Sequence, residues 1–500
     1  MNIIMVLLDS LNFHCLEPYG ATHVRTPNLS RFAKRAVAFD HHFIGSAPCM
    51  PARGELFTGR QEFPWRGWGH IEPWARHVAK DVERCGHVTQ MITDHYHYWE
   101  SGAHGYFEPF HGVDFVRGHE LDMWDTAPIT ETPEWARSID RYRDSTARQR
   151  PGWGSLYYSN ARAFERDAHL FPCAGVMQRS ADWLARNATH DRFFLWTETF
   201  DPHEPHFLPE SYRTMYSPDG RDHPEFTCWP PYQNEAQLRR FLDQTSDEEL
   251  AWIRAQYYGK VTMVDHWLGR LLDRMDALNL WENTTMIVTT DHGHELCADR
   301  ALPSPYGKEY PHREAHSRIP LMIYHPQATA GRRVSALTAA VDVNATIRDL
   351  AGDGAPDGPH GRSLLPLLLG QTEVHRDHVL FGDFGNGVCL ATDEWILAQG
   401  CQASRPLNWY STTSTRVSPD MVSGKFIPGV EIPQWRVPVT GADCPSFLWR
   451  RHPFSLTPRN VIDEEPDALR QMKERLRDAL AALPAPPELL HRLDIEPSGR

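Results

Sequence analysis

Residues 49–60 read CMPARGELFTGR and place a cysteine, a proline and an arginine at the start of a predicted helix. The positive end of a helix dipole and the nearby cation Arg53 both favour the anionic form of a sulfur at Cys49. The stretch therefore predicts a nucleophile at Cys49. The alternative is a buried cysteine that begins a helix in an unrelated α/β protein.

The pattern C-x-P-x-R-G followed by L-x-T-G-R resembles the signature of the type I sulfatases and of their relatives, the phosphonate monoester hydrolases. In that family the cysteine is oxidised after synthesis to formylglycine, whose hydrated aldehyde supplies the attacking oxygen. The resemblance implies that Cys49 is the precursor of the nucleophile. It also implies a formylglycine-generating enzyme as a partner during maturation.

The composition is that of a globular protein, since 41% of the 500 residues are hydrophobic and 23% are charged. This length is sufficient for one large core and a smaller appended domain. The 51 basic and 65 acidic residues give a formal net charge of -14. No basic surplus exists to neutralise phosphates, so we do not expect nucleic acid as the main partner. A small anionic ester substrate would need a local cationic pocket.

The N-terminal run, residues 1–9, is too short and too abruptly acidic for a signal peptide. No later segment approaches the ~20 apolar residues that cross a bilayer. The nine cysteines show no C-x-x-C pair or framework spacing. We therefore expect a cytoplasmic, reducing setting and no membrane partner.

Residues 3–8 are continuously apolar, as in a central strand of a mostly parallel sheet that is covered on both faces. Asp9 then lies at the carboxyl end of this strand, where open α/β sheets place their ligand sites. A metal ligand and a helix-capping aspartate both fit this position. The resemblance selects the metal, because the strand-end aspartate of sulfatases binds a divalent cation. Many relatives have a second aspartate next, whereas this chain has Ser10.

A β-rich run, residues 88–93, leads into the segment 94–99, DHYHYW. His95 and His97 are two residues apart, so they share a face at a strand end. Sulfatases often have a lysine and a histidine at this spacing, which contact the anionic group and the leaving oxygen. The resemblance gives these roles to His95 and His97. The alternative is a solvated loop in a chain with 28 histidines.

A strand predicted at residues 193–197 is followed by the segment 201–206, DPHEPH. Prolines on both sides of His203 fix the backbone of this loop. The D-P-H-x-P pattern resembles the family loop that carries a substrate-facing histidine. His203 is therefore a second candidate for a general acid or base, and without the resemblance the segment is simply a rigid turn.

A further strand, residues 284–290, runs directly into Asp291 and His292. A carboxylate and an imidazole side by side suit a divalent ion, and the glycine that follows allows the tight turn that aims both inward. In the family this is the second half of the metal site. The resemblance implies one divalent ion, Ca²⁺ in first place and Mn²⁺ or Mg²⁺ as alternatives, bound by these residues with Asp9 and residue 49.

Two basic side chains supply the positive charge of the predicted site. In relatives the lysine after the D-H-G motif bridges the nucleophile oxygen and the anionic oxygens of the substrate, which assigns this role to Lys308; a solvated loop lysine is the alternative. Arg53 adds fixed positive charge where the transition state gathers negative charge. One histidine of His97 and His203 would protonate the leaving oxygen, and the other would help restore the aldehyde.

The order of the motifs predicts an α/β fold of the alkaline phosphatase and sulfatase type. The large catalytic domain, residues 1–375, has a central mainly parallel sheet flanked by helices, and residues 100–190 form an insertion at the pocket rim. Residues 376–500 form a small C-terminal α+β subdomain with an antiparallel sheet and a helix opened by Pro466. The apolar stripe of this helix packs on the body or on a partner subunit, which leaves a homo-oligomer open.

The predicted function is metal-dependent hydrolysis of sulfate esters by formylglycine at position 49. A phosphonate monoester or phosphodiester hydrolase with the same machinery is the main alternative. The missing signal peptide, Ser10 and the histidines in place of a lysine favour it, since fewer positive charges suit a singly charged diester. A non-catalytic binding protein on this fold is a third reading, although loss of function would usually erase some of the motif residues, and these are present.

Overall fold

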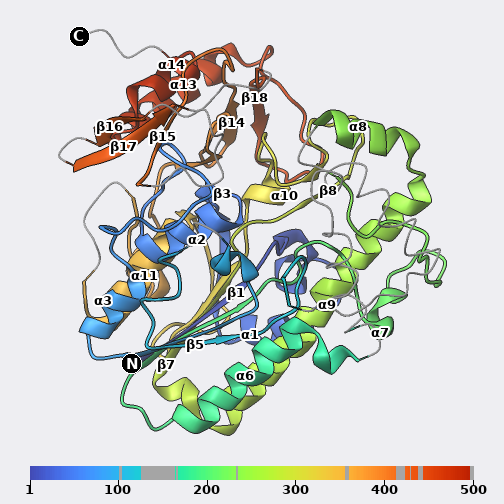
Figure 1. Ribbon diagram of the computed structural model, residues 1–500, viewed down its shortest axis with the longest axis vertical. Coiled ribbons are helices and arrows are strands. Elements are labelled where there is room, and N and C mark those ends of the chain that lie inside the picture. The colour runs from blue at the N-terminus through green and yellow to red at the C-terminus, as the bar shows by residue number, and fades with distance from the viewer. Residues whose placement is uncertain are drawn as a thin grey trace.

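The computed structural model describes most of the chain as a large α/β body with a smaller sheet and helices of the C-terminal part at one end (Figure 1). Residues 125–163 of the predicted pocket-rim insertion lie outside the described residues. The described residues are 1–100, 104–124, 164, 167–231, 235–354, 360–412, 423–427, 430–436 and 443–495.

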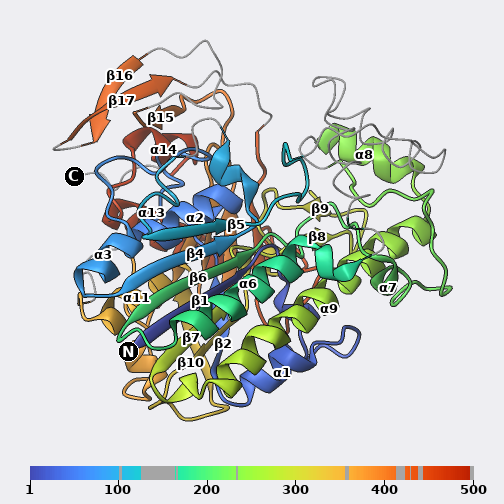
Figure 2. The same cartoon turned by 60° about the horizontal axis from the view of Figure 1, so that its bottom comes forward.

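An eight-stranded sheet forms the centre of the body, in the order β11-β2-β10-β7-β1-β6-β4-β5 (Figure 2). Its neighbouring strands run parallel, apart from β10, which is antiparallel to both β2 and β7. The predicted central, mainly parallel sheet is therefore confirmed. The strands are β1 (Asn2–Leu8), β2 (Val37–Phe43), β4 (Val88–Thr93), β5 (Gly112–Phe115), β6 (Phe193–Thr199), β7 (Thr284–Thr289), β10 (Leu321–Tyr324) and β11 (Arg333–Ala339).

Helices cover both faces of this sheet, which explains why every residue of β1 is buried. Alternate residues of β1 enter two different cores, as the two-residue period of a strand requires. The first core contains Ile4 and the helices α1 (Pro27–Ala33), α6 (Pro172–Asn187) and α9 (Asp247–Ala277). The second contains Ile3 and the helices α2 (Cys49–Thr58), α3 (Val78–Arg84) and α11 (Val341–Ala351).

Shorter elements complete the body. The amphipathic pattern near residues 247–278, which fitted one helix or two, forms the single helix α9, and Ser246 caps it by accepting a hydrogen bond from the Glu249 backbone N–H. The remaining elements are α7 (Glu210–Arg213), α8 (Glu235–Gln244), α10 (Glu314–Ser317), α12 (Leu365–Leu368), β8 (Glu295–Leu296) and β9 (Tyr306–Gly307).

A second sheet has the order β18-β14-β13-β12-β3. The strands β12 (Val379–Asp383), β13 (Val388–Ala391), β14 (Trp395–Gln399) and β18 (Phe447–Arg450) are antiparallel, as predicted. The fifth strand, β3 (Ser46–Ala47), comes from the segment just before α2 and pairs in parallel with β12. This smaller sheet is therefore mixed, and the domain boundary at residue 375 stays a prediction.

The predicted C-terminal helix is α13 (Pro466–Ala482), which begins at Pro466. Its apolar stripe, with Met472, Leu476 and Leu480, packs on Leu390 and Leu397 of the second sheet. The stripe thus packs mainly on the smaller sheet of the C-terminal part, with Phe63 of the body in the same cluster, and a homo-oligomer stays a prediction. The C-terminal part also contains β15 (Asn408–Tyr410), β16 (Ser423–Ile427), β17 (Val430–Arg436) and α14 (Pro487–Arg492).

Within the described ranges, none of the helices combines the length and the apolar character that crossing a membrane requires.

A buried neutral histidine links the stability of the fold to pH. His42 in β2 is completely buried, and its Nδ1 lies 2.9 Å from Thr338 Oγ1. Burial lowers the pKa of His42 to about 3, whereas a histidine in an unfolded chain titrates near ~6.5. The unfolded chain binds the proton first as the pH falls. This contribution to stability is therefore complete above the unfolded pKa and is lost progressively below it.

The variant His42→Gln lacks this titration. Relative to the variant, the wild type is expected to lose about 2 kcal/mol of unfolding free energy when the pH falls from ~7 to ~5. Urea unfolding of both proteins at the two pH values measures this difference. Equal losses in the two proteins would contradict the prediction.

Candidate active site

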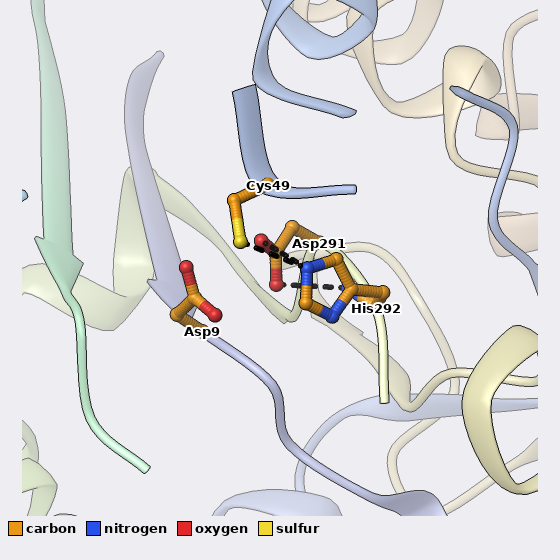
Figure 3. Close-up of side chains that lie close together, drawn as sticks. All are labelled: Asp9, Cys49, Asp291 and His292. Atoms are coloured by element: carbon orange, nitrogen blue, oxygen red, sulfur yellow. Dashed lines mark hydrogen bonds and ion pairs between the residues drawn. The ribbon is translucent and has the colours of Figure 1, made fainter. Parts of the chain in front are cut away.

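Four side chains meet at the carboxyl edge of the large sheet (Figure 3). Asp9 follows β1, Asp291 and His292 follow β7, and Cys49 is the first residue of α2. Strands β1 and β7 are parallel neighbours, so the residues that follow them reach the same edge. The four side chains are buried, and the atoms that they could offer to a metal ion lie within 4.8 Å of one another. The structure thus brings the predicted metal-binding residues together.

Arg53 lies one turn after Cys49 in α2 and is completely buried among three carboxylates. Its guanidinium donates to Glu198 and Asp291, both at 2.5 Å, and to Asp9 at 2.8 Å. It also donates to the backbone carbonyl of Cys49 at 3.2 Å. Arg53 therefore orients the carboxylates of the site and fixes the first turn of α2.

The charges of this cluster fit a divalent cation. Asp9, Asp291 and Glu198 carry one carboxylate each, and the single positive charge of Arg53 compensates one of the three negative charges. The pKa of Asp9 is raised well above its ordinary value, first by burial and then by the negative charge of Asp291. Two uncompensated buried negative charges are costly unless a cation joins them. The donor set therefore fits the divalent ion that the sequence predicts.

The Cys49 thiol lies 3.2 Å from His292 Nε2 and 3.7 Å from Lys308 Nζ. Burial raises the pKa of this thiol well above its ordinary value, and the negative charge of Asp9 raises it further. The opposing effects of Lys308 and Arg53 are smaller. Burial of the Cys49 thiol therefore opposes the stabilisation of a thiolate that the helix start and Arg53 provide.

Ser10 stands where many relatives of the resembled family have a second aspartate. Its backbone φ is +62°, in the left-handed region that few residues other than glycine adopt. Its hydroxyl donates to Asp9 at 2.7 Å and its backbone N–H donates to Asp291 at 3.1 Å. The hydroxyl of Tyr257 donates to its carbonyl at 2.7 Å. Ser10 therefore holds both aspartates in place.

Lys308 follows β9 and is buried, so the alternative of a solvated loop lysine is wrong. Its Nζ lies 3.2 Å from the carboxylate of Glu204, which comes from the loop after β6. Glu204 also lies 3.2 Å from His294 Nε2. The neighbouring His203 imidazole and the positive charge of Lys308 hold the pKa of Glu204 well below the usual range despite burial. The charge of Lys308 is thus partly balanced within the protein.

His95 and His97 follow β4 and lie at the short 3-10 helix η3 (Tyr96–Trp99). Both are buried, so the alternative of a solvated loop is wrong. His95 Nε2 lies 3.8 Å from Asp9, and the two imidazole rings are 5.2 Å apart. His97 Nδ1 lies 3.0 Å from Glu100. Burial lowers the pKa of His95 well below its ordinary value, which keeps its ring neutral.

His203 is buried in the predicted proline-bounded loop, and its ring stacks on Phe200 at 4.2 Å. Burial lowers its pKa well below the ordinary value. Lys260 of α9 donates to the His203 carbonyl at 2.7 Å and pairs with Asp201 at 2.6 Å. The long helix α9 therefore fixes the loop that carries His203.

Sequence reasoning missed three charged residues that shape the site: Glu198, Glu204 and Lys260. Glu198 had a detectable signal, because a carboxylate in the otherwise apolar run FFLWTET needs a buried partner. It accepts from Arg53 and also from Tyr98 at 2.8 Å. Glu204 had no comparable signal, since it stands in the polar loop DPHEPH. Lys260 had one, because it lies three residues after Tyr257 and four before Val264, on the apolar face of α9.

Comparisons with known proteins cover most of the chain. A model of the sulfatase family matches residues 1–353. The chain is 24% identical to the arylsulfatase of Clostridium perfringens over 406 residues, which covers 76% of this chain and 80% of that protein. It is 24% identical over 468 residues to the multifunctional alkaline phosphatase superfamily protein PehA of Trinickia caryophylli, covering 79% of this chain and 84% of PehA.

A solved structure shares the fold. The phosphonate monoester hydrolase of Silicibacter pomeroyi superimposes with a TM-score of 0.66 at 19% sequence identity, covering 96% of this chain and 95% of that chain. The predicted alkaline phosphatase and sulfatase type of fold is therefore confirmed.

Proposed function

The chain belongs to the sulfatase family of hydrolases, and from this membership we propose that it cleaves sulfate esters with a formylglycine nucleophile formed from Cys49. The observation that carries the proposal is the buried cluster of Asp9, Cys49, Asp291 and His292. The proposed partners are a small anionic ester as substrate and a formylglycine-generating enzyme during maturation. The proposed setting is the cytoplasm.

Asp9, Asp291 and His292 would hold one divalent ion, with Ca²⁺ proposed first and Mn²⁺ or Mg²⁺ as alternatives. When bound, such an ion neutralises the anionic oxygens of the substrate and lowers the pKa of a hydroxyl beside it. Arg53 keeps the two aspartates oriented, since it donates to both. The position of the Cys49 sulfur marks where residue 49 would present its attacking oxygen.

Lys308, whose Nζ lies 3.7 Å from the Cys49 sulfur, is proposed to hold an anionic oxygen of the substrate, since it pairs with the one carboxylate of Glu204 whereas Arg53 pairs with three. His97 and His203 are proposed to divide the proton transfers. One ring donates a proton to the leaving oxygen, and the other takes a proton from residue 49 when the ester bond to the enzyme breaks.

The charge balance favours substrates with a single negative charge. Arg53 and Lys308 are both paired with carboxylates, and His95 stays neutral in the place where a lysine is common in the resembled family. Sulfate esters carry one negative charge, and so do phosphonate monoesters and phosphodiesters. The second candidate function is therefore hydrolysis of phosphonate monoesters or phosphodiesters by the same residues, which Ser10 also favours.

The mass of the tryptic peptide 36–53 tests the proposed nucleophile. In protein produced together with a formylglycine-generating enzyme, we expect this peptide to be ~18 Da lighter than its cysteine form, because formylglycine replaces the thiol with an aldehyde. Protein produced without the enzyme is the control. An unmodified cysteine in both samples would show that the proposed nucleophile is wrong.

Turnover separates the two candidate functions. The modified protein is assayed with an aryl sulfate, an aryl phosphonate monoester and an aryl phosphate monoester. We expect the highest kcat/KM with the sulfate and the lowest with the doubly charged phosphate. A faster reaction with the phosphonate would select the second candidate function, and no turnover of any ester would select the non-catalytic binding protein.

A further inference from the structure

Two cysteines of the C-terminal part lie side by side on neighbouring chain segments. Gly400 follows the end of β14, and Cys401 comes next. Cys444 lies just before β18. The backbone N–H of Cys444 donates to the carbonyl of Cys401 at 2.9 Å. One such bond limits the distance between the two Cα atoms to about 7 Å, and disulfides span Cα distances up to about 6.8 Å.

Gly400 permits this close approach of the two segments. A Cβ atom at Gly400 would lie 1.9 Å from the carbonyl oxygen of Cys444, so no larger residue fits there. The backbone N–H of Gly400 also donates to the hydroxyl of Ser446 at 2.9 Å. The two cysteines are therefore held in one register by contacts on both sides.

The two thiols differ in their environment. The Cys401 thiol lies 3.7 Å from the carbonyl oxygen of Gly385. The neighbouring Cys444 side chain lowers the pKa of Cys401 to about 7, and the Cys401 side chain raises the pKa of Cys444. The positive charge of Arg492 in α14 also lowers the pKa of Cys401. Cys401 is 3% exposed, and Cys444 is half-buried. The pair thus consists of a partly ionised, shielded sulfur and a neighbouring thiol.

We propose that Cys401 and Cys444 form a redox-active dithiol that peroxides oxidise to a disulfide. The site is separate from the metal cluster and does not depend on the proposed hydrolase function. A small oxidant such as hydrogen peroxide suits a sulfur that is almost completely shielded. The register of the two segments places the second thiol where it reacts with the oxidised first one before further oxidation.

The reaction takes place in two steps. The Cys401 thiolate attacks one oxygen of hydrogen peroxide, so that an S–O bond forms, the O–O bond breaks, and the released hydroxide is protonated to water. The Cys444 sulfur then attacks the Cys401 sulfenic acid. An S–S bond forms, the S–O bond breaks, and the hydroxide leaves with the Cys444 proton as a second water. Both sulfurs are oxidised, and both peroxide oxygens are reduced.

The disulfide would lie beside a hydrogen bond that holds the segment carrying Lys308. The hydroxyl of Tyr310 donates to the carbonyl of Pro445, the residue after Cys444, at 2.9 Å. The Cys444 thiol also lies 3.8 Å from the side-chain oxygen of Asn386. Oxidation therefore places a covalent crosslink at the base of this contact.

Peptide mapping of the full chain tests the proposal. Reduced protein is treated with hydrogen peroxide, blocked with N-ethylmaleimide and digested with trypsin. We expect a linked pair of the peptides 377–416 and 437–450, ~2 Da lighter than their summed masses, which dithiothreitol separates again. The unrelated buried thiol of Cys173 is expected to remain alkylatable after unfolding.

Cys389 provides a matched control, because it lies in the same tryptic peptide as Cys401. The link is expected to persist in Cys389→Ser and to be lost in both Cys401→Ser and Cys444→Ser. A link that persists in Cys401→Ser overturns the assignment. Two results with the peroxide-treated wild type would overturn the proposal itself. In the first, Cys401 is oxidised to the sulfinic acid while Cys444 remains a free thiol that N-ethylmaleimide alkylates. In the second, both cysteines remain free thiols.

Discussion

Replacing Cys49 by alanine is expected to lower kcat by about 10⁴-fold or more, because it removes the side chain from which the proposed nucleophile is formed. Asp9, Asp291, His292 and Arg53 remain in place, so binding of the substrate and of a divalent ion is expected to persist. The measurement is kcat for an aryl sulfate with protein produced in the presence of the formylglycine-generating enzyme.

The matched control for this variant is Cys173→Ala in α6. Cys173 and Cys49 are both buried, with exposed fractions of 0% and 2%, but Cys173 lies in the core of the opposite face of the sheet. We expect Cys173→Ala to retain its kcat and both variants to lose similar, small amounts of stability. A kcat of Cys49→Ala within about tenfold of wild type would show that residue 49 is not the nucleophile.

The variant Arg53→Met is expected to be the most destabilised substitution at the site. Removing one partner of a buried ion pair typically costs about 3–5 kcal/mol, because the remaining charges are left uncompensated. Arg53 pairs with three carboxylates, and its side chain and theirs are completely buried. A divalent ion compensates part of the same negative charge, so the variant should gain more thermal stability from added Ca²⁺ than wild type does.

Arg451→Met is the control for the electrostatic part of this prediction. Arg451 is also completely buried and pairs with the single carboxylate of Glu314 at 3.1 Å. Its loss should lower the melting temperature without changing the shift that Ca²⁺ produces. Thermal unfolding of wild type and both variants, with Ca²⁺ and with a chelator, measures both effects. An equal Ca²⁺ shift in wild type and Arg53→Met would show that Arg53 does not share its carboxylates with a bound cation.

The residues of the candidate metal site were predictable from the sequence because each stands at the end of an apolar run or at the start of a helix. Asp9 ends an apolar run, Asp291 and His292 end another, and Cys49 begins a helix. The family signature then connected these boundaries to one site. The comparisons support the membership that this signature implied, since the family model covers residues 1–353.

The ion pairs were not predictable in the same way, because they depend on which strands are neighbours. Glu198 of β6 meets Arg53 of α2 at the edge of the sheet, although residues 54–197 separate them in sequence. Glu204 meets Lys308 across two loops that are distant in the chain. The burial of Cys49, which raises the pKa of its thiol, was also not predictable from the local sequence.

The pairing of β3 with β12 sets a limit on the time in which Cys49 can be modified. Residues 46 and 47 are held by residues 382 and 383, and Cys49 itself is 2% exposed in the folded chain. At a synthesis rate of about 5–20 residues per second, the ribosome needs roughly 15–70 s to progress from one segment to the other. During that interval the cysteine segment has no β12 to pair with. A maturation enzyme that needs an extended peptide therefore has to act during translation or compete with folding directly afterwards.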